Sequence, residues 1–163
     1  MTKRAISIQL RPDLNKLLQS TLHKHQIELN ICASQNEARR AMLKENYCLA
    51  VIDTSMLTTE KAVEYIEDFR LDTYAPIVSV NEAEATKQIL NAGADASFSV
   101  SVSPDMVVFH AMALLRRYTL YNHYDELKPG DAVLHRGDLM IDPIRHHVML
   151  AGRESRVVCK RLY

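Results

Sequence analysis

Asp53 is the residue whose position most directly suggests chemistry, because it ends an apolar run. Residues 48–52 read C-L-A-V-I and contain no polar side chain, which is typical of a strand buried on both faces of a parallel sheet. The carboxyl ends of parallel strands form the edge at which open α/β sheets bind their ligands. Asp53 is therefore a candidate site residue. The alternative is that Asp53 only turns the chain out of the sheet, as aspartate often does.

No other residues form a catalytic or metal-binding pattern. His23 and His25 do not have a spacing that aims both at one ion, and His146 and His147 alternate to opposite faces of a predicted strand. No cysteine or carboxylate completes either pair as a ligand set. With only four glycines there is no glycine-rich phosphate loop, and no nucleophile pattern is present. We therefore expect no metal, no cofactor and no independent enzyme activity.

Composition limits the class of protein. The chain has 163 residues, of which 47% are hydrophobic and 25% charged, and this is typical of a globular protein with a proper core. Twenty basic and twenty acidic residues cancel, so no general attraction to nucleic acid or membranes follows. No signal peptide or membrane span is predicted, and we expect a cytoplasmic protein without a membrane partner. Cys32, Cys48 and Cys159 are expected to be reduced thiols.

Strand and helix patterns alternate five times before residue 121. The expected strands are 5–10, 27–32, 48–52, 77–80 and 96–100, and the expected helices are 13–24, 35–44, 59–69, 84–91 and 105–121. Ser34 is expected to cap the second helix with Glu37, and Thr59 to cap the third. Right-handed crossovers make such an alternation a doubly wound α/β fold with a parallel sheet. The expected strand order is the flavodoxin-like 2-1-3-4-5, which places Asp53 at the switch point.

The pattern changes after Tyr121. Residues 122–131 are polar and include Pro129 and Gly130, so they are predicted to be a linker. Short strands are then expected at 133–135, 138–142, 146–152 and 155–159. Residues 132–163 therefore predict a small antiparallel sheet, which is too short to bury a core of its own.

Four segments in this order resemble the response regulators of the OmpR/PhoB type. They are Y-C-L-A-V-I-D-T-S-M-L at 47–57, G-A-D-A-S-F at 93–98, A-L-L-R-R at 113–117, and the stretch from G-D-L-M-I-D at 137–142 to A-G-R-E-S-R-V-V at 151–158. The resemblance implies a receiver domain over 1–121 with Asp53 at the position of the phosphorylated aspartate. It also implies that 132–163 is the sheet that precedes a winged-helix DNA-binding domain.

Several positions depart from the pattern of that family. Its two magnesium-binding acids fall on Gln9 and Leu10, its hydroxyl residue after the fourth strand on Asn81, its lysine on Val100, and its switching tyrosine on Ser97. Leucine cannot ligate a hard cation, and glutamine offers only a neutral oxygen where magnesium prefers carboxylates. Valine removes the cation that would pair with a phosphate. Magnesium-dependent phosphorylation of Asp53 is therefore not expected to be the main switch.

The surface through which this family dimerises is also altered. Leu90 and Val108 match its apolar patch and Asp95 matches one of its acids, whereas usually charged positions are occupied by Met106, His110 and Met112. Exposed apolar surface of this kind is usually buried against a partner. We therefore expect a homodimer that forms without phosphate, through helix 84–91, the strand at Asp95 and helix 105–121. The alternative is that the methionines pack on the linker.

The resemblance implies an atypical transcriptional regulator. DNA binding is expected of a full-length form only, because the sequence given ends at Tyr163, before a recognition helix. A sensor kinase or another regulatory protein is a possible partner. Two alternatives stay open: an adaptor that caps another regulator, and a receiver that is phosphorylated with the help of substitute ligands.

Overall fold

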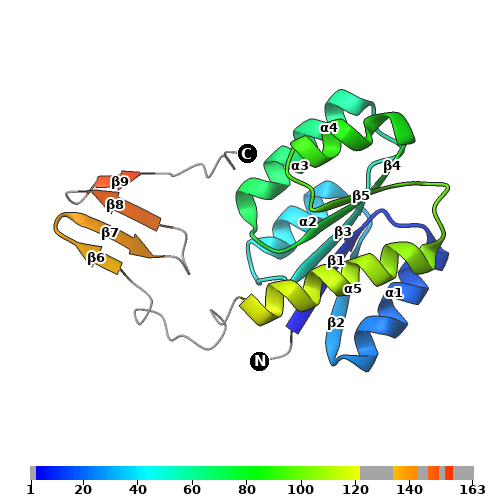
Figure 1. Ribbon diagram of the computed structural model, residues 1–163, viewed down its shortest axis with the longest axis horizontal. Helices are drawn as coiled ribbons and strands as arrows, with labels where there is room; N and C mark the ends of the chain where they lie inside the picture. Colours follow the sequence, from blue (N-terminus) through cyan, green and yellow to red (C-terminus); the bar gives the residue numbers. More distant parts are fainter. Residues whose placement is uncertain (1–2, 122–133, 143–146, 151–152, 156–163) are drawn as a thin grey trace. The chain divides into compact units, whose positions relative to one another are not determined.

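The computed structural model describes residues 3–121, 134–142, 147–150 and 153–155 (Figure 1). The chain divides into two compact units, Met1–Thr119 and Leu120–Tyr163, and each is described by itself. The predicted linker 122–131 and Cys159 lie outside the described residues. No helix of the described part is long and apolar enough to cross a membrane.

The first unit is built on a five-stranded parallel sheet in the order β2-β1-β3-β4-β5. The strands are β1 Lys3–Ile8, β2 Ile27–Cys32, β3 Leu49–Asp53, β4 Ile77–Asn81 and β5 Ala96–Ser99. The helices are α1 Pro12–Lys24, α2 Gln35–Met42, α3 Thr59–Asp72, α4 Thr86–Asn91 and α5 Pro104–Tyr121, with a 3₁₀ turn η1 at Ala83–Ala85. This confirms the predicted fold class and strand order.

Helices cover both faces of the sheet, and the buried strands serve both layers. On β3, Ala50 and Ile52 pack in the cluster that includes residues of α2, α3 and α4, while Leu49 and Val51 pack with α1 and α5. Figure 1 shows α1 and α5 on one side of the sheet and the other three helices on the opposite side. The apolar run without alternation is therefore explained by burial on both faces.

Local boundaries differ from prediction where the chain leaves an element. β1 ends at Ile8, because Gln9 has a φ of 57° and its amide donates to the carbonyl of Cys32. Thr58, and not Thr59, precedes the first residue of α3, and its side chain makes no capping hydrogen bond. The predicted cap of α2 is confirmed, since the Ser34 hydroxyl accepts from the Glu37 amide at 3.2 Å.

Arg70 fixes the amino-terminal ends of β4 and β5. Its guanidinium donates to the carbonyl of Gly93 at 2.9 and 2.8 Å, to the carbonyls of Thr73 and Ala75 at 3.2 and 3.0 Å, and to the Asp95 carboxylate at 2.5 Å. The Asp95 carboxylate also accepts from the amide of Ile77 at 2.9 Å. Gly93 is required here, because its φ is 118° and an added Cβ would lie 3.1 Å from Cγ of Arg70.

The second unit contains a four-stranded antiparallel sheet in sequential order. Its strands are β6 Leu134–Arg136, β7 Leu139–Asp142, β8 His147–Leu150 and β9 Arg153–Ser155. Arg136 pairs with Leu139, and Gly137 begins the two-residue turn between them with a φ of 60°, as the first turn position of a tight hairpin favours. Arg153 pairs with Leu150 at the start of β9. The predicted strand 155–159 overlaps β9 only at Ser155, and its other residues lie outside the described part of the chain.

Candidate functional site

Asp53 lies at the carboxyl edge of the sheet as the last residue of β3. It is 8% exposed, and its Oδ1 accepts from the amide and the hydroxyl of Ser55 at 2.9 and 2.6 Å. The next residue, Thr54, is also buried and donates its amide to the carbonyl of Val80 on β4. The carboxylate is thus presented by the strand and oriented by the turn that follows it.

Gln9 and Leu10, which follow β1, do not provide ligands for a hard cation. Gln9 is exposed, and Leu10 is 7% exposed within the apolar cluster that packs α1 and α5 on the sheet. Magnesium prefers carboxylate and other hard oxygen ligands at a nearly octahedral site. Within the described residues, no group of three histidine, cysteine, aspartate or glutamate side chains could hold a metal ion. The donor set around Asp53 therefore does not fit the magnesium site that the resemblance implies.

Arg11 joins two loops at this edge and was not singled out from the sequence. Its Nη1 donates to the carbonyl of Val100 at 3.1 Å, across 89 positions of sequence. Val100 itself packs against the apolar cluster and donates its amide to the carbonyl of Asn81. The chain thus has no cationic side chain at position 100. The Arg11 guanidinium, from the loop before α1, instead binds the main chain of the loop after β5. An arginine directly after Leu10 was the signal available in the sequence.

Asn81 ends β4 and is held by hydrogen bonds on both sides of its carboxamide. It is 1% exposed. Its Nδ2 donates to the carbonyl of Glu82 at 2.7 Å and to the hydroxyl of Thr86 at 3.2 Å, and its Oδ1 accepts from the hydroxyl of Ser97 at 2.5 Å. Both donor hydrogens and one acceptor site are therefore used within the unit. The structure brings together Asn81 and Ser97, the two positions where the family pattern has its hydroxyl residue and its switching tyrosine.

Ser79, two residues before Asn81 on β4, has a hydroxyl but lies deeper in the sheet. It is fully buried, and its hydroxyl lies 3.4 Å from that of Thr54. This contact links β4 to the residue after Asp53 and does not extend to the exposed edge.

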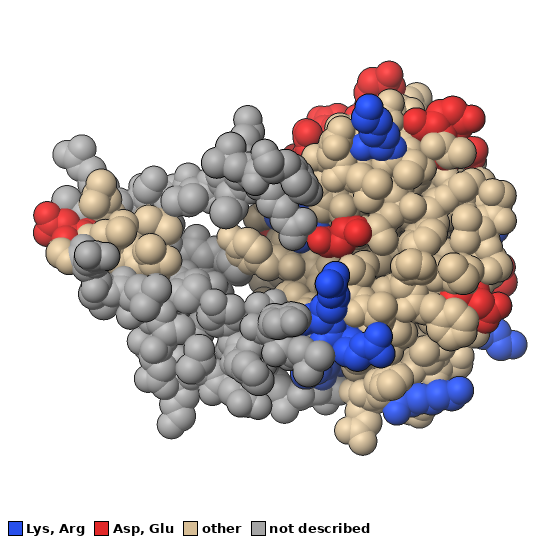
Figure 2. Space-filling model, viewed as in Figure 1, with Lys and Arg blue, Asp and Glu red and all other residues tan. Residues whose placement is uncertain are grey.

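The expected dimer surface is exposed only in part. Leu90 is 40% exposed and Met106 is 46% exposed. His110 is also exposed, whereas Met112 is half-buried. Val108 is 2% exposed and packs in the cluster with α1. Its assignment to the surface was therefore wrong, because Val108 faces the core of its own unit. Figure 2 shows that most of the surface over β5 and α5 is uncharged.

Two further residues change the composition of that surface. Phe109 is 66% exposed and was not predicted, although it follows Val108 directly on α5. Asp95 is 17% exposed in its side chain and is bound to Arg70 of the same unit. The ring of His110 lies 5.1 Å from that of Phe98, measured between centroids. Apolar area at this surface thus comes from Leu90, Met106 and Phe109.

Comparison with known proteins identifies the fold. No protein-family model matches the chain, and no curated protein matches it. Among solved structures, a two-component response regulator from Clostridium difficile is 21% identical, with a TM-score of 0.59, covering 71% of this chain and 97% of that one. An atypical orphan response regulator with a phosphorylation-independent regulatory mechanism is 16% identical, with a TM-score of 0.57, covering 69% and 95%.

A third structure aligns over a longer part of the chain. It belongs to a family of redox sensors in the streptococci that evolved from two-component response regulators. It is 18% identical, with a TM-score of 0.59, and the match covers 96% of this chain and 69% of that one. The first unit therefore has the fold of response-regulator receiver domains.

Proposed function

We propose that this chain is an atypical response regulator whose receiver acts without magnesium-dependent phosphorylation of Asp53. The observation that carries the proposal is the donor set at the carboxyl edge of the sheet. Leu10 is apolar and buried where a metal ligand would be needed, and Asn81 has both of its donor hydrogens engaged within the unit. Phosphoryl transfer depends almost wholly on positioning and on charge stabilisation by metal and cation.

Arg11 supports the proposal because it joins the loop after β1 to the loop after β5 through a main-chain carbonyl, a contact in which Asp53 takes no part. Its guanidinium holds the loop after β5 through the carbonyl of Val100. Asn81 and Ser97 join the ends of β4 and β5 at 2.5 Å in the same way. The two loops and the two strand ends are thus joined by hydrogen bonds in which Asp53 takes no part, which supports ordering of this edge without phosphorylation.

The chemical test is the intact mass of the protein after incubation with acetyl phosphate and magnesium. The proposal predicts no gain of a phosphoryl group on the wild type. The Asp53→Asn variant is the control for modification at other residues. A phosphoryl gain on the wild type that is absent from Asp53→Asn would contradict the proposal and favour the receiver with substitute ligands.

We further propose that the receiver forms a homodimer through the surface of α4, β5 and α5. Leu90, Met106 and Phe109 expose apolar area there, and contiguous apolar surface of this kind marks protein interfaces. Figure 2 shows that much of the surface over β5 and α5 is uncharged, which supports association through apolar contacts. Asp95 contributes through its bond to Arg70, which holds the start of β5 in place.

Charge insertion tests this interface with a matched pair of variants. Phe109 on α5 and Leu71 on α3 are each 66% exposed, so a glutamate is equally tolerated by the fold at either position. Phe109→Glu is expected to produce a monomer in sedimentation experiments, whereas Leu71→Glu should stay dimeric. A dimer that survives Phe109→Glu would place the interface elsewhere.

The OmpR/PhoB type is proposed for the second unit. Strands β6 to β9 form a four-stranded antiparallel sheet, which supports assignment to the sheet before a winged helix-turn-helix. Sequence-specific DNA binding is then expected only of a form that also carries a recognition helix. A gel-shift experiment with such a form separates this function from the alternative, an adaptor that caps another regulator and shows no specific DNA binding.

A further inference from the structure

His110 lies on the side of α5 that faces β5. Its ring centroid is 5.1 Å from that of Phe98 on β5, and the two ring planes are inclined at 55°. Met106 and Ala113 are four positions before it and three positions after it, so helical spacing puts them on the same side of α5. His110 and Met106 are both exposed, and Ala113 is half-buried. An ionisable side chain thus lies within the apolar part of this surface.

The elements beside α5 provide no net negative charge for His110. Strand β5 itself has no charged side chain. Asp95, which precedes β5, is bound to Arg70 of its own unit. Glu84 in η1 and Lys87 on α4 are exposed and three positions apart, and their charges are opposite. The charges that β5, η1 and α4 contribute to this surface therefore balance.

The charge that α5 itself presents beside His110 is positive. Arg117 is exposed and follows His110 by seven positions, which puts it two turns farther along the same side of the helix. Asp105 and Arg116, five positions before and six after, lie on other sides of α5. A protonated His110 would therefore add a second positive charge to this side of α5.

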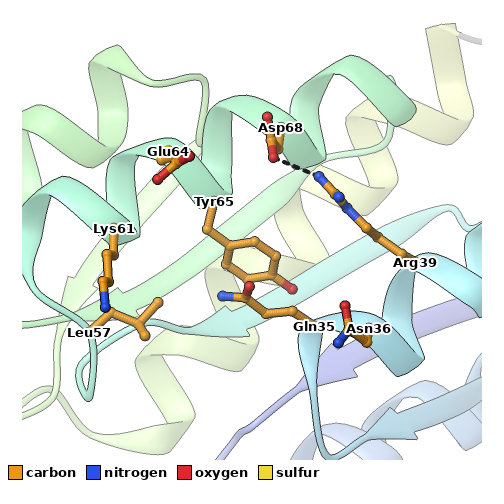
Figure 3. A pocket seen from close by; sticks show the side chains of 8 residues that line it. All are labelled: Gln35, Asn36, Arg39, Leu57, Lys61, Glu64, Tyr65 and Asp68. Atoms are coloured by element: carbon orange, nitrogen blue, oxygen red, sulfur yellow. Dashed lines mark hydrogen bonds and ion pairs between the residues drawn. The ribbon is translucent and has the colours of Figure 1, made fainter.

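The His110 imidazole has no protein partner among the described residues. No hydrogen bond or ion pair joins it to any of them. The opposite side of the sheet differs, because Arg39 of α2 and Asp68 of α3 form an ion pair at 2.6 Å (Figure 3). Histidine is the side chain that ordinarily changes its charge between pH 5 and pH 8. Protonation of His110 would thus leave a cation on this surface that only water stabilises.

We propose that His110 makes association of the receiver dependent on pH, with a dimer at alkaline pH and monomers in mild acid. This inference rests on the proposed homodimer through α4, β5 and α5. A second copy can cover a neutral imidazole, but covering an unpaired imidazolium removes a charge from water at a large cost. Each dimer contains two such residues. Because the monomers bind protons that the dimer excludes, a fall in pH favours the monomers.

The test is sedimentation equilibrium of the whole chain at pH 8, 7, 6 and 5, with circular dichroism at each pH to verify the fold. The Kd of the wild-type dimer should rise at least about tenfold between pH 8 and pH 5. His110→Gln stays neutral and should remain dimeric throughout. His110→Arg carries a permanent charge and should already be weakened at pH 8. His23→Gln, at an exposed position on α1, is the matched control and should behave as the wild type does.

The outcomes distinguish this inference from the dimer on which it rests. A wild type that is equally dimeric at every pH would overturn the role of His110 and leave the dimer intact. A pH dependence that persists in His110→Gln would assign the effect to other groups and overturn the inference as well. A wild type that is monomeric at every pH would contradict the proposed dimer and, with it, the role of His110.

Discussion

Strands β4 and β5 carry polar networks at both ends, and the two networks differ in charge. At the amino-terminal end, Arg70 and Asp95 form an ion pair that also binds main-chain carbonyls and an amide. At the carboxyl end, Asn81 and Ser97 form a neutral pair. A charged network therefore joins the two strands where they begin, and a neutral pair joins them where they end. Under the proposed function, this difference means that the fold is maintained although the phosphorylation chemistry is not.

The largest expected loss of stability comes from removing Arg70 from the charged network at the amino-terminal ends of β4 and β5. Arg70→Met keeps the aliphatic packing on Gly93 but leaves the Asp95 carboxylate, 17% exposed, without its cation. Removing one partner of a largely buried pair costs about 3 kcal/mol. Urea unfolding monitored by circular dichroism measures the change in the free energy of unfolding.

Arg39→Met is the matched control for that variant. The Arg39–Asp68 pair has a similar length, but both side chains are about half exposed, so its loss should cost less than about 1 kcal/mol. Equal losses in the two variants would mean that the Arg70 network contributes no more to stability than a surface ion pair.

An intermediate effect is expected at the neutral end. Ser97→Ala removes the donor to Oδ1 of Asn81, a residue that is 1% exposed, and an unsatisfied buried acceptor costs about 1.5 kcal/mol. Ser99→Ala removes only an exposed hydroxyl contact with Ser101 and should change stability by less than about 0.5 kcal/mol. Thermal unfolding of both variants compares them. If they were equally stable, the Asn81–Ser97 bond could not be what joins the two strand ends.

The smallest effect is expected for a buried polar group outside both networks. Tyr65→Phe removes a hydroxyl that has no hydrogen-bond partner among the described residues, and the free energy of unfolding should rise by up to about 1 kcal/mol. The raised pKa of Tyr65 keeps the folded form neutral where the unfolded chain ionises. The wild type should therefore lose stability above about pH 10, the ordinary value for tyrosine.

The pH dependence provides the comparison for that variant. Tyr65→Phe should lose less stability than the wild type as the pH rises through that region, since it lacks the ionising group. Parallel stability curves for the two proteins in alkaline solution would show that Tyr65 is not buried as described.

The fold could be predicted from the sequence because its signals are local. The apolar run of β3, the Ser34 cap with Glu37 and the glycine after α4 each act within a few residues, and five strand–helix repeats leave one sensible architecture. Exposure on α5 could not be predicted. Val108 and Phe109 are adjacent and both apolar, and only packing against α1 decides which of them is buried.

The candidate site was predictable as a set of positions but not as a set of contacts. Gln9, Leu10 and Val100 could be assigned from the order of motifs. The bond from Arg11 to the Val100 carbonyl joins residues 89 positions apart. The periodicity of apolar residues in the sequence does not predict a contact over such a separation. The Asn81–Ser97 bond likewise depends on the pairing of β4 with β5, where Ser79 lies opposite Ser97.

The central claim is that this receiver assembles without phosphate. The most direct measurement is the molar mass in solution by multi-angle light scattering, with magnesium, before and after addition of beryllofluoride, which mimics a phosphoryl group on aspartate. The account predicts the mass of a dimer in both states. A monomer that becomes a dimer only after addition would contradict it, because Asp53 would then possess a working metal site despite Gln9 and Leu10.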